Sequence, residues 1–119
     1  MLPRELVSLL QVNEKQTAQN TKALLKKYPH YKRLASRKFQ DELTTSALKQ
    51  VRAIDESLKQ LDELDAFILK NRFINGFKFN DVAKHVGLGT SRFSDYQKRA
   101  LLEFAEVYTL DNLISLAGV

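Results

Sequence analysis

Several features are scarce or missing in this 119-residue sequence. It contains no cysteine, which excludes disulfide bonds, thiolate catalysis and zinc sites built on cysteine, and which suits a reducing cytosol. No run approaches the roughly 18 apolar residues that a membrane-spanning helix requires, and the opening MLPRELVSLLQVNEKQ soon turns polar. We therefore expect a soluble, unexported cytoplasmic protein without a membrane partner. Only two prolines and four glycines interrupt the chain, so we expect a mostly helical fold.

Charge is distributed in three blocks along the sequence, whose net charge is +5. Residues 20–39 contain seven lysines and arginines and no acid, whereas residues 40–65 contain seven acids and three bases. Residues 66–106 are basic again, with seven bases and four acids. Two basic blocks on either side of an acidic one indicate a polyanionic partner that is contacted in two places. An ordinary solvated surface is the alternative for each block taken alone.

The first third of the sequence predicts one helix and a short basic turn. Asn13 can accept hydrogen bonds from the first free amides, and Gln16 occupies the capping-box position three residues later. The helix should end before Pro29, which restricts the backbone of Tyr28. A brief helical turn can follow in HYKRLASRKF.

The middle of the sequence predicts two amphipathic helices from apolar side chains at steps of three and four. The segment DELTTSALKQVRAIDESLKQL should bury a face made of Leu43, Ala47, Val51, Ile54, Leu58 and Leu61. A break is expected near Asp62, where a group of acids suits a helix start. The next segment, LDELDAFILKNRF, should bury Leu64, Phe67, Ile68 and Phe73. Asn75 and Gly76 then predict a tight turn.

Two glycines interrupt the helical pattern of DVAKHVGLGTSRFSDYQKRALLEFA. A short helix capped by Asn80 comes first, and its inward residues should be Val82, Ala83 and Val86. Gly87 is expected in the left-handed conformation that ends this helix. Leu88 can fill the space between the helices, and Gly89 takes the N-cap position of a longer helix. From Thr90 onwards the inward face should comprise Phe93, Tyr96, Ala100, Leu101 and Phe104.

A short helix, a glycine-containing corner and a longer helix with a polar outer face form a helix-turn-helix arrangement. Such a second helix fits the major groove of duplex DNA, where its N-terminal turns meet base edges. Arg92 can form a bidentate contact with guanine or hold a phosphate, and Asp95 can accept from a cytosine amino group. The candidate DNA-binding residues are Thr90, Ser91, Arg92, Ser94, Asp95, Lys98 and Arg99, the last two of which suit the phosphate backbone. A plain helical hairpin with a solvated polar face is the alternative.

Other constellations in the sequence carry less chemistry. Asp81 and His85 lie four residues apart on one helix, but two ligands do not make a metal site. No phosphate-binding glycine loop, nucleophile elbow or convincing acid–base pair occurs, so we expect no enzyme activity, no cofactor and no metal. Tyr28 and Tyr31 could stack on bases or pack the basic region onto its own domain. Secondary DNA contacts could come from Lys26, Lys27, Lys32 and Arg33.

Two longer stretches carry a family resemblance. The stretch LDAFILKNRFINGFKFNDVAKHVGLGTSRFSDYQKRALLEFAEVY resembles region 4 of sigma-70-type factors. The separated motifs LLKKYPHYKRLA and YQKRALLEFAEVY resemble the ArpU family of phage-encoded transcriptional regulators, which is associated with late gene control. This resemblance spans roughly residues 12–108, and Gly89 stands where these sequences often carry serine. It implies base-facing positions at Thr90, Ser91, Ser94 and Asp95, with Arg92, Lys98 and Arg99 beside the DNA backbone.

The sequence therefore predicts an all-α protein with a sigma region 4-like helix-turn-helix. Its segments are a basic N-terminal helical region (1–40), a connecting amphipathic helix (41–61), the helix-turn-helix (62–107) and a C-terminal tail (108–119). The expected function is sequence-specific binding of duplex DNA by a transcriptional regulator, such as a phage or prophage late-gene activator. One alternative is a small terminase subunit that marks phage DNA for packaging, with the apolar tail forming a homo-oligomer or else completing the core. Another is a module that docks on RNA polymerase through residues 40–65.

Overall fold

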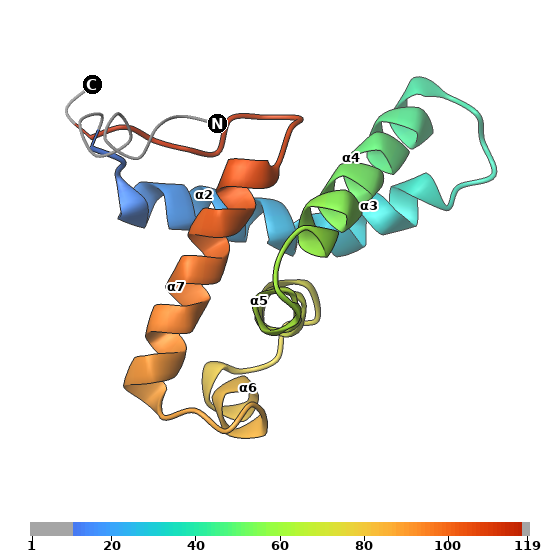
Figure 1. Cartoon of the computed structure of the whole chain (residues 1–119). Helices are drawn as coiled ribbons and strands as arrows, with labels where there is room; N and C mark the ends of the chain where they lie inside the picture. Colours follow the sequence, from blue (N-terminus) through green and yellow to red (C-terminus); the bar gives the residue numbers. More distant parts are fainter. Residues whose placement is uncertain (1–10, 118–119) are drawn as a thin grey trace.

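The computed structural model describes residues 11–117, and over this range its regular structure is helical apart from one isolated bridge (Figure 1). The expected all-α class is confirmed. The elements in chain order are α2 (Glu14–Lys26), α3 (Tyr28–Ala35), α4 (Glu42–Lys59), α5 (Glu63–Leu69), the π-helical turn η1 (Lys70–Ile74), α6 (Phe79–His85) and α7 (Thr90–Val107). None of these described helices is long and apolar enough to cross a bilayer. The apolar opening and the outer ends of the predicted N-terminal region and tail, residues 1–10 and 118–119, lie outside the described residues.

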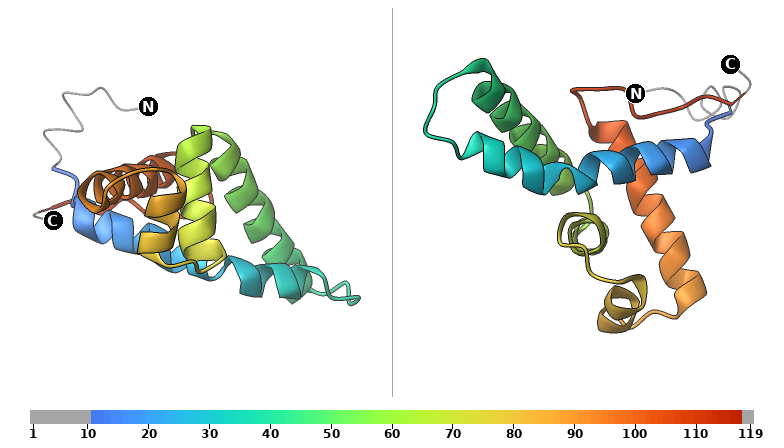
Figure 2. Two further views of the ribbon diagram at one scale, coloured as in Figure 1. Left: turned by 90° about the horizontal axis from the view of Figure 1, so that it is seen from below. Right: turned by 180° about the vertical axis from the view of Figure 1, so that it is seen from behind.

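The helices are arranged around α7, which runs from the corner with α6 up to α2 (Figure 1). α2 and α3 follow one another almost end to end, and α4 returns beside α3 (Figure 2). α5 and η1 lie between this layer and α6, and the described chain extends 45 × 36 × 22 Å. The corner between α6 and α7 consequently lies at the opposite end of the molecule from α2 and α3.

The start of α2 follows its local sequence. The Asn13 side chain accepts a hydrogen bond from the Gln16 amide at 3.0 Å, which confirms the predicted cap. The capping box does not close, because the Gln16 side chain donates to Asn20 Oδ1 at 2.9 Å instead. α2 ends at Lys26, and Pro29 occupies the first turn of α3, where its missing amide costs no helical hydrogen bond.

The predicted cap at Asn80 is wrong. α6 already begins at Phe79, and the N-cap is Lys78, whose backbone is extended and whose side chain makes no capping hydrogen bond. Phe79 packs edge-on against Phe93 at 4.8 Å between ring centroids. This tertiary contact favours a helix that starts two residues earlier than the cap signal indicates.

Two buried clusters organise the side chains. The main core joins α2, α3, α4, α5, η1 and α7 to the tail, and its most buried members are Leu25, Ile54, Leu69, Ala100, Leu101 and Phe104. A smaller cluster, here called the corner core, consists of the buried residues Ile68, Val82, Ala83 and Phe93. All four predicted segments contribute residues to the main core, so the N-terminal helices and the tail pack on the same body as the helix-turn-helix.

Three predicted inward residues are exposed. Leu43 is 52 % exposed because it lies in the first turn of α4, near the outer end of the α3–α4 hairpin. Leu64 and Phe67 are each 37 % exposed, whereas Leu69, which the pattern omitted, is completely buried. Phe73 is 5 % exposed, so its predicted burial is confirmed, although the π-helical turn Lys70–Ile74 interrupts the α-helical spacing.

The tail completes the core of its own chain. Leu113 is buried, and the chain beyond it runs back along the start of α2. The Asn13 amide donates to the Ser115 carbonyl at 2.8 Å, and the Ser115 amide donates to Thr17 Oγ1 at 2.9 Å. Of the two roles considered for the tail, these contacts favour core completion.

Candidate nucleic-acid interface

The corner between α6 and α7 has the predicted backbone conformation. Gly87 has a φ of 75°, and a Cβ built there would meet nothing within 4 Å, so glycine is favoured by conformation rather than by space. The Leu88 amide donates to the Ala83 carbonyl at 3.0 Å, and the Gly87 amide donates to the Lys84 carbonyl at 3.1 Å. This pair of bonds is a Schellman motif, which ends α6 abruptly. Gly89 is the N-cap of α7 and provides no capping side chain, as expected.

The corner core sets how α7 leaves the corner. Phe93 is completely buried, and Ala83 is 2 % exposed, as befits a small residue at a close helix crossing. Leu88 and Tyr96 are partly buried against this cluster. The predicted inward face at the start of α7 is therefore confirmed, and the opposite face of the helix points to solvent.

The first turns of α7 present a continuous polar surface. Its members are all exposed and are Thr90, Ser91, Arg92, Ser94 and Asp95. Within residues 11–117 none of these side chains forms a hydrogen bond or an ion pair with another part of the protein. The first turns of α7 lie at the corner with α6, at the end of the molecule far from α3 (Figures 1 and 2). The structure thus brings five of the seven predicted site residues together on one unpaired surface.

Lys98 and Arg99 differ from these five because both have partners. Lys98 Nζ lies 3.3 Å from a Glu14 carboxylate oxygen, and about half of each side chain is exposed. Arg99 Nη2 lies 3.2 Å from Asp65 Oδ1, and its Nε lies 3.6 Å from Glu103 Oε1. Asp65 is completely buried, so Arg99 fastens α7 to α5. The sequence placed Arg99 beside DNA, but its nearest charge partner is an acid 34 residues earlier.

Glu103 and Asp65 form a carboxyl pair at this α5–α7 contact. Burial, together with the hydrogen bond and negative charge of Asp65, raises the pKa of Glu103 to about 7. Asp65 Oδ2 is buried and has no hydrogen-bond partner within the described residues. A proton on Glu103 lets this carboxyl donate to Asp65, so the contact is strongest when Glu103 is protonated.

We expect the pair to make stability depend on pH near neutrality. Because the folded pKa of Glu103 is raised to about 7 from an ordinary 4.5, its stabilising contribution is complete below about 4.5 and is lost as the pH rises through 7. The unsubstituted protein should gain unfolding free energy when the pH falls from about 8.5 to about 5.5. Glu103→Gln should make this gain smaller by about 1 kcal/mol. This figure is modest because 39 % of the side chain remains exposed.

Urea denaturation at several pH values measures this effect. Glu106→Gln is the matched control, since Glu106 is exposed about one turn further along α7 and the substitution changes the charge equally. Equal pH dependence in the two variants would contradict the predicted role of Glu103.

Arg72 is a second structural arginine. Its Nε donates to Gln97 Oε1 at 2.9 Å, and its Nη1 donates to the Phe77 carbonyl at 2.7 Å. Its guanidinium also lies over the rings of Phe73 and Phe79, at 5.1 and 5.7 Å from their centroids. Burial lowers the pKa of Arg72 from its usual value. Arg72 therefore ties η1, the following loop and α7 together.

The predicted secondary contacts lie away from the first turns of α7. They are exposed on the end of α2 and on α3, and they are Lys26, Lys27, Lys32 and Arg33 (Figure 1). Tyr28 is buried and donates from its hydroxyl to Asp55 Oδ1 at 2.8 Å, so it packs this region onto α4 rather than offering a free ring. Burial and Asp55 raise the pKa of Tyr28 to about 12.

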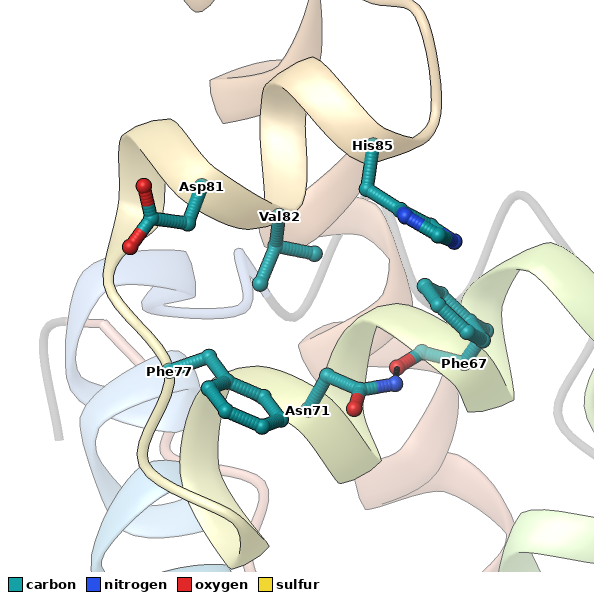
Figure 3. A pocket seen from close by; sticks show the side chains of 6 residues that line it. All are labelled: Phe67, Asn71, Phe77, Asp81, Val82 and His85. Atoms are coloured by element: carbon teal, nitrogen blue, oxygen red, sulfur yellow. Dashed lines mark hydrogen bonds between the residues drawn. The ribbon is translucent and has the colours of Figure 1, made fainter.

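A shallow hollow of about 230 Å³ lies between α5, η1 and α6 (Figure 3). It is lined by Phe67, Asn71, Phe77, Asp81, Val82 and His85. The His85 ring stacks on Phe67 at 5.4 Å between centroids, and Phe77 is 55 % exposed. Of the two residues whose spacing resembled that of metal ligands, Asp81 and His85, the histidine therefore packs against Phe67.

These features can be set beside known proteins. No protein-family model, curated protein or solved structure matches this chain.

Proposed function

We propose that this protein is a sequence-specific duplex DNA-binding regulator of transcription that inserts the first turns of α7 into the major groove. The observation that supports this most is the unpaired polar surface of those turns, which is held on a helix anchored by the corner core. A helix of this kind fits the major groove, and side chains in its N-terminal turns reach base edges there. The regulation of phage or prophage late genes is proposed from the resemblance to the ArpU family.

The residue types on this surface support reading of bases. Arg92 can donate two hydrogen bonds to guanine, and Asp95 can accept one from cytosine. The small side chains of Thr90, Ser91 and Ser94 allow the helix to approach closely. Gly89 leaves the first amides of α7 without a side-chain cap, so these amides can donate to a phosphate.

Arg92→Ala should lower the affinity for the preferred sequence about tenfold or more, because a bidentate contact with guanine discriminates by roughly 1–3 kcal/mol. The experiment first selects bound fragments from a pool of randomised duplexes near physiological salt. It then measures the affinity of each variant for the selected and for a scrambled duplex.

Arg52→Ala is the matched control, because Arg52 is an exposed arginine on α4 and its loss changes the net charge equally. Selection that enriches no sequence, or equal effects of the two substitutions, would reject the proposal. Two alternatives predict other results: ring formation in solution would favour a terminase subunit, and tight binding to RNA polymerase without affinity for DNA would favour a docking module.

A further inference from the structure

A hollow between α2 and α7 is lined mainly by cations and amides. Its volume is about 430 Å³. The polar side chains that line it are Lys15, Gln19 and Lys22 from α2, and Ser94, Gln97 and Lys98 from α7. Among residues 11–117, no acid belongs to this lining. Three ammonium groups, a hydroxyl and two amides are the donors that bind phosphate oxygens.

The hollow is preformed because the two helices are packed together at its floor. Thr21 is completely buried and donates from Oγ1 to the Leu101 carbonyl of α7 at 3.1 Å. Ala18 and Leu101 are buried in the main core below the lysines. A ligand would therefore meet donors carried by two helices that are already packed together, so binding would have to order only the side chains.

The hollow adjoins the surface proposed to read DNA. Ser94 belongs to both, and Lys98 lies one helical turn further along α7. A duplex that receives the start of α7 in its major groove has its own phosphate backbone on either side of that helix. The wall on the α2 side carries Lys15 and Lys22, neither of which belongs to the secondary contacts predicted from the sequence.

The Glu14 carboxylate forms an ion pair with Lys98 and would compete with a phosphate for this lysine. It holds Lys98 at 3.3 Å, but both side chains are about half exposed, and exposed pairs contribute little to stability. A phosphate can therefore replace the carboxylate at Lys98. Lys22 forms no ion pair with any of residues 11–117, and its ammonium group lies 5.8 Å from the centre of the Phe73 ring.

We propose that the hollow between α2 and α7 binds the phosphate backbone of the same duplex, with Lys15, Lys22 and Lys98 as its cations. This inference rests on the proposed function and extends the DNA-binding surface from α7 to α2. The second basic contact is then formed by Lys15 and Lys22, in place of the lysines and arginine that the sequence predicted at the end of α2 and on α3. Glu14 limits the affinity by occupying Lys98 in the free protein.

The test compares two double substitutions on the same helix. Lys15→Ala with Lys22→Ala should lower affinity about tenfold for selected and scrambled duplexes alike, because phosphate contacts carry no sequence information. The slope of log affinity against log salt should fall by about 2 between roughly 50 and 200 mM salt. Lys26→Ala with Lys27→Ala changes the charge equally at the C-terminal end of α2, outside the lining of the hollow, and should leave both quantities nearly unchanged. Thermal melting verifies that each variant is folded.

Glu14→Gln provides a second, opposite test that does not depend on losing a side chain from the hollow. It should raise the affinity about threefold by releasing Lys98 and removing one negative charge. Equal losses from the two double substitutions, or an unchanged affinity for Glu14→Gln, would overturn the inference.

The outcomes separate this inference from the proposed function. Loss of binding on Arg92→Ala without any effect of Lys15 and Lys22 would overturn the hollow alone. Binding that depends on the two lysines but enriches no sequence would reject base reading and support the hollow. A protein that binds no duplex at all would overturn both.

Discussion

Phe93→Ala should lower the free energy of unfolding by about 4 kcal/mol, because a fully buried aromatic ring is lost and leaves a cavity. Phe93 is completely buried and contacts Phe79 edge-on. The other buried members of the corner core are only Ile68, Val82 and Ala83. So small a cluster has few side chains that could move to fill the space.

The damage should be local as well as large. The main core does not include Phe93, so α2, α4 and the end of α7 keep their packing. α6, which is held mainly through the corner core, should lose most of its protection against amide hydrogen exchange, and DNA binding by the adjoining turns should fail with it.

Chemical denaturation and residue-resolved hydrogen exchange measure the two parts of this prediction. Phe77→Ala is the control, since Phe77 is 55 % exposed in the loop before α6 and should cost less than about 0.5 kcal/mol. A uniform loss of protection across the described helices would show that the corner core is not a separate unit of stability.

Arg99→Met should cost about 3 kcal/mol at a pH near 8, because it removes the cation that faces a buried carboxylate. Asp65 is completely buried and receives its hydrogen bond from Arg99 Nη2 at 3.2 Å. The Arg99 guanidinium carbon also lies 4.5 Å from the centre of the Tyr96 ring, so Met keeps an aliphatic stem but removes the charge, the donors and this cation–π contact. The loss should shrink as the pH falls through about 7, because a protonated Glu103 can then donate to Asp65.

Lys98→Met is the matched control for this prediction. Lys98 precedes Arg99 on α7, and its ion pair with Glu14 is exposed on both sides, so its removal should cost about 0.5 kcal/mol or less. Equilibrium unfolding at two pH values compares the variants. Equal costs, or a cost for Arg99→Met that does not change with pH, would mean that the α5–α7 contact does not depend on this charge pair.

The corner could be predicted from the sequence because its determinants are neighbours in the chain. The positive φ of Gly87, the N-cap at Gly89 and the turn at Gly76 all follow from local backbone preferences. The spacing of Phe93, Ala100 and Phe104 likewise identified the buried face of α7.

Local patterns were wrong where packing overrides them. Asn80 has the chemistry of a cap, yet the contact of Phe79 with Phe93 starts α6 earlier. Leu64 and Phe67 have the correct spacing for burial, yet each remains 37 % exposed. Apolar periodicity identifies one face of a helix, but it does not show which other element packs against that face.

Polar residues were the least predictable part of the site. Asp65 resembles a helix-start acid in the sequence, but it is buried as the partner of Arg99. Lys15 and Lys22 stand at the edge of the basic block, and no sequence signal connects them with Ser94, which lies more than seventy residues later. The spacing of apolar residues could not reveal that these polar residues are neighbours, because their proximity depends on which helices cross in the folded protein.

The sequence by itself determined an all-helical chain, a glycine corner and the set of polar side chains that leave the outer face of α7. The tertiary structure decided which of those side chains are free to meet a partner. Arg92 is unpaired within the described residues, whereas Arg99 is bound to a buried acid and Lys98 to an exposed one. Helical periodicity assigns a side chain to a face, but its electrostatic partners come from distant segments that only folding brings within a few ångströms.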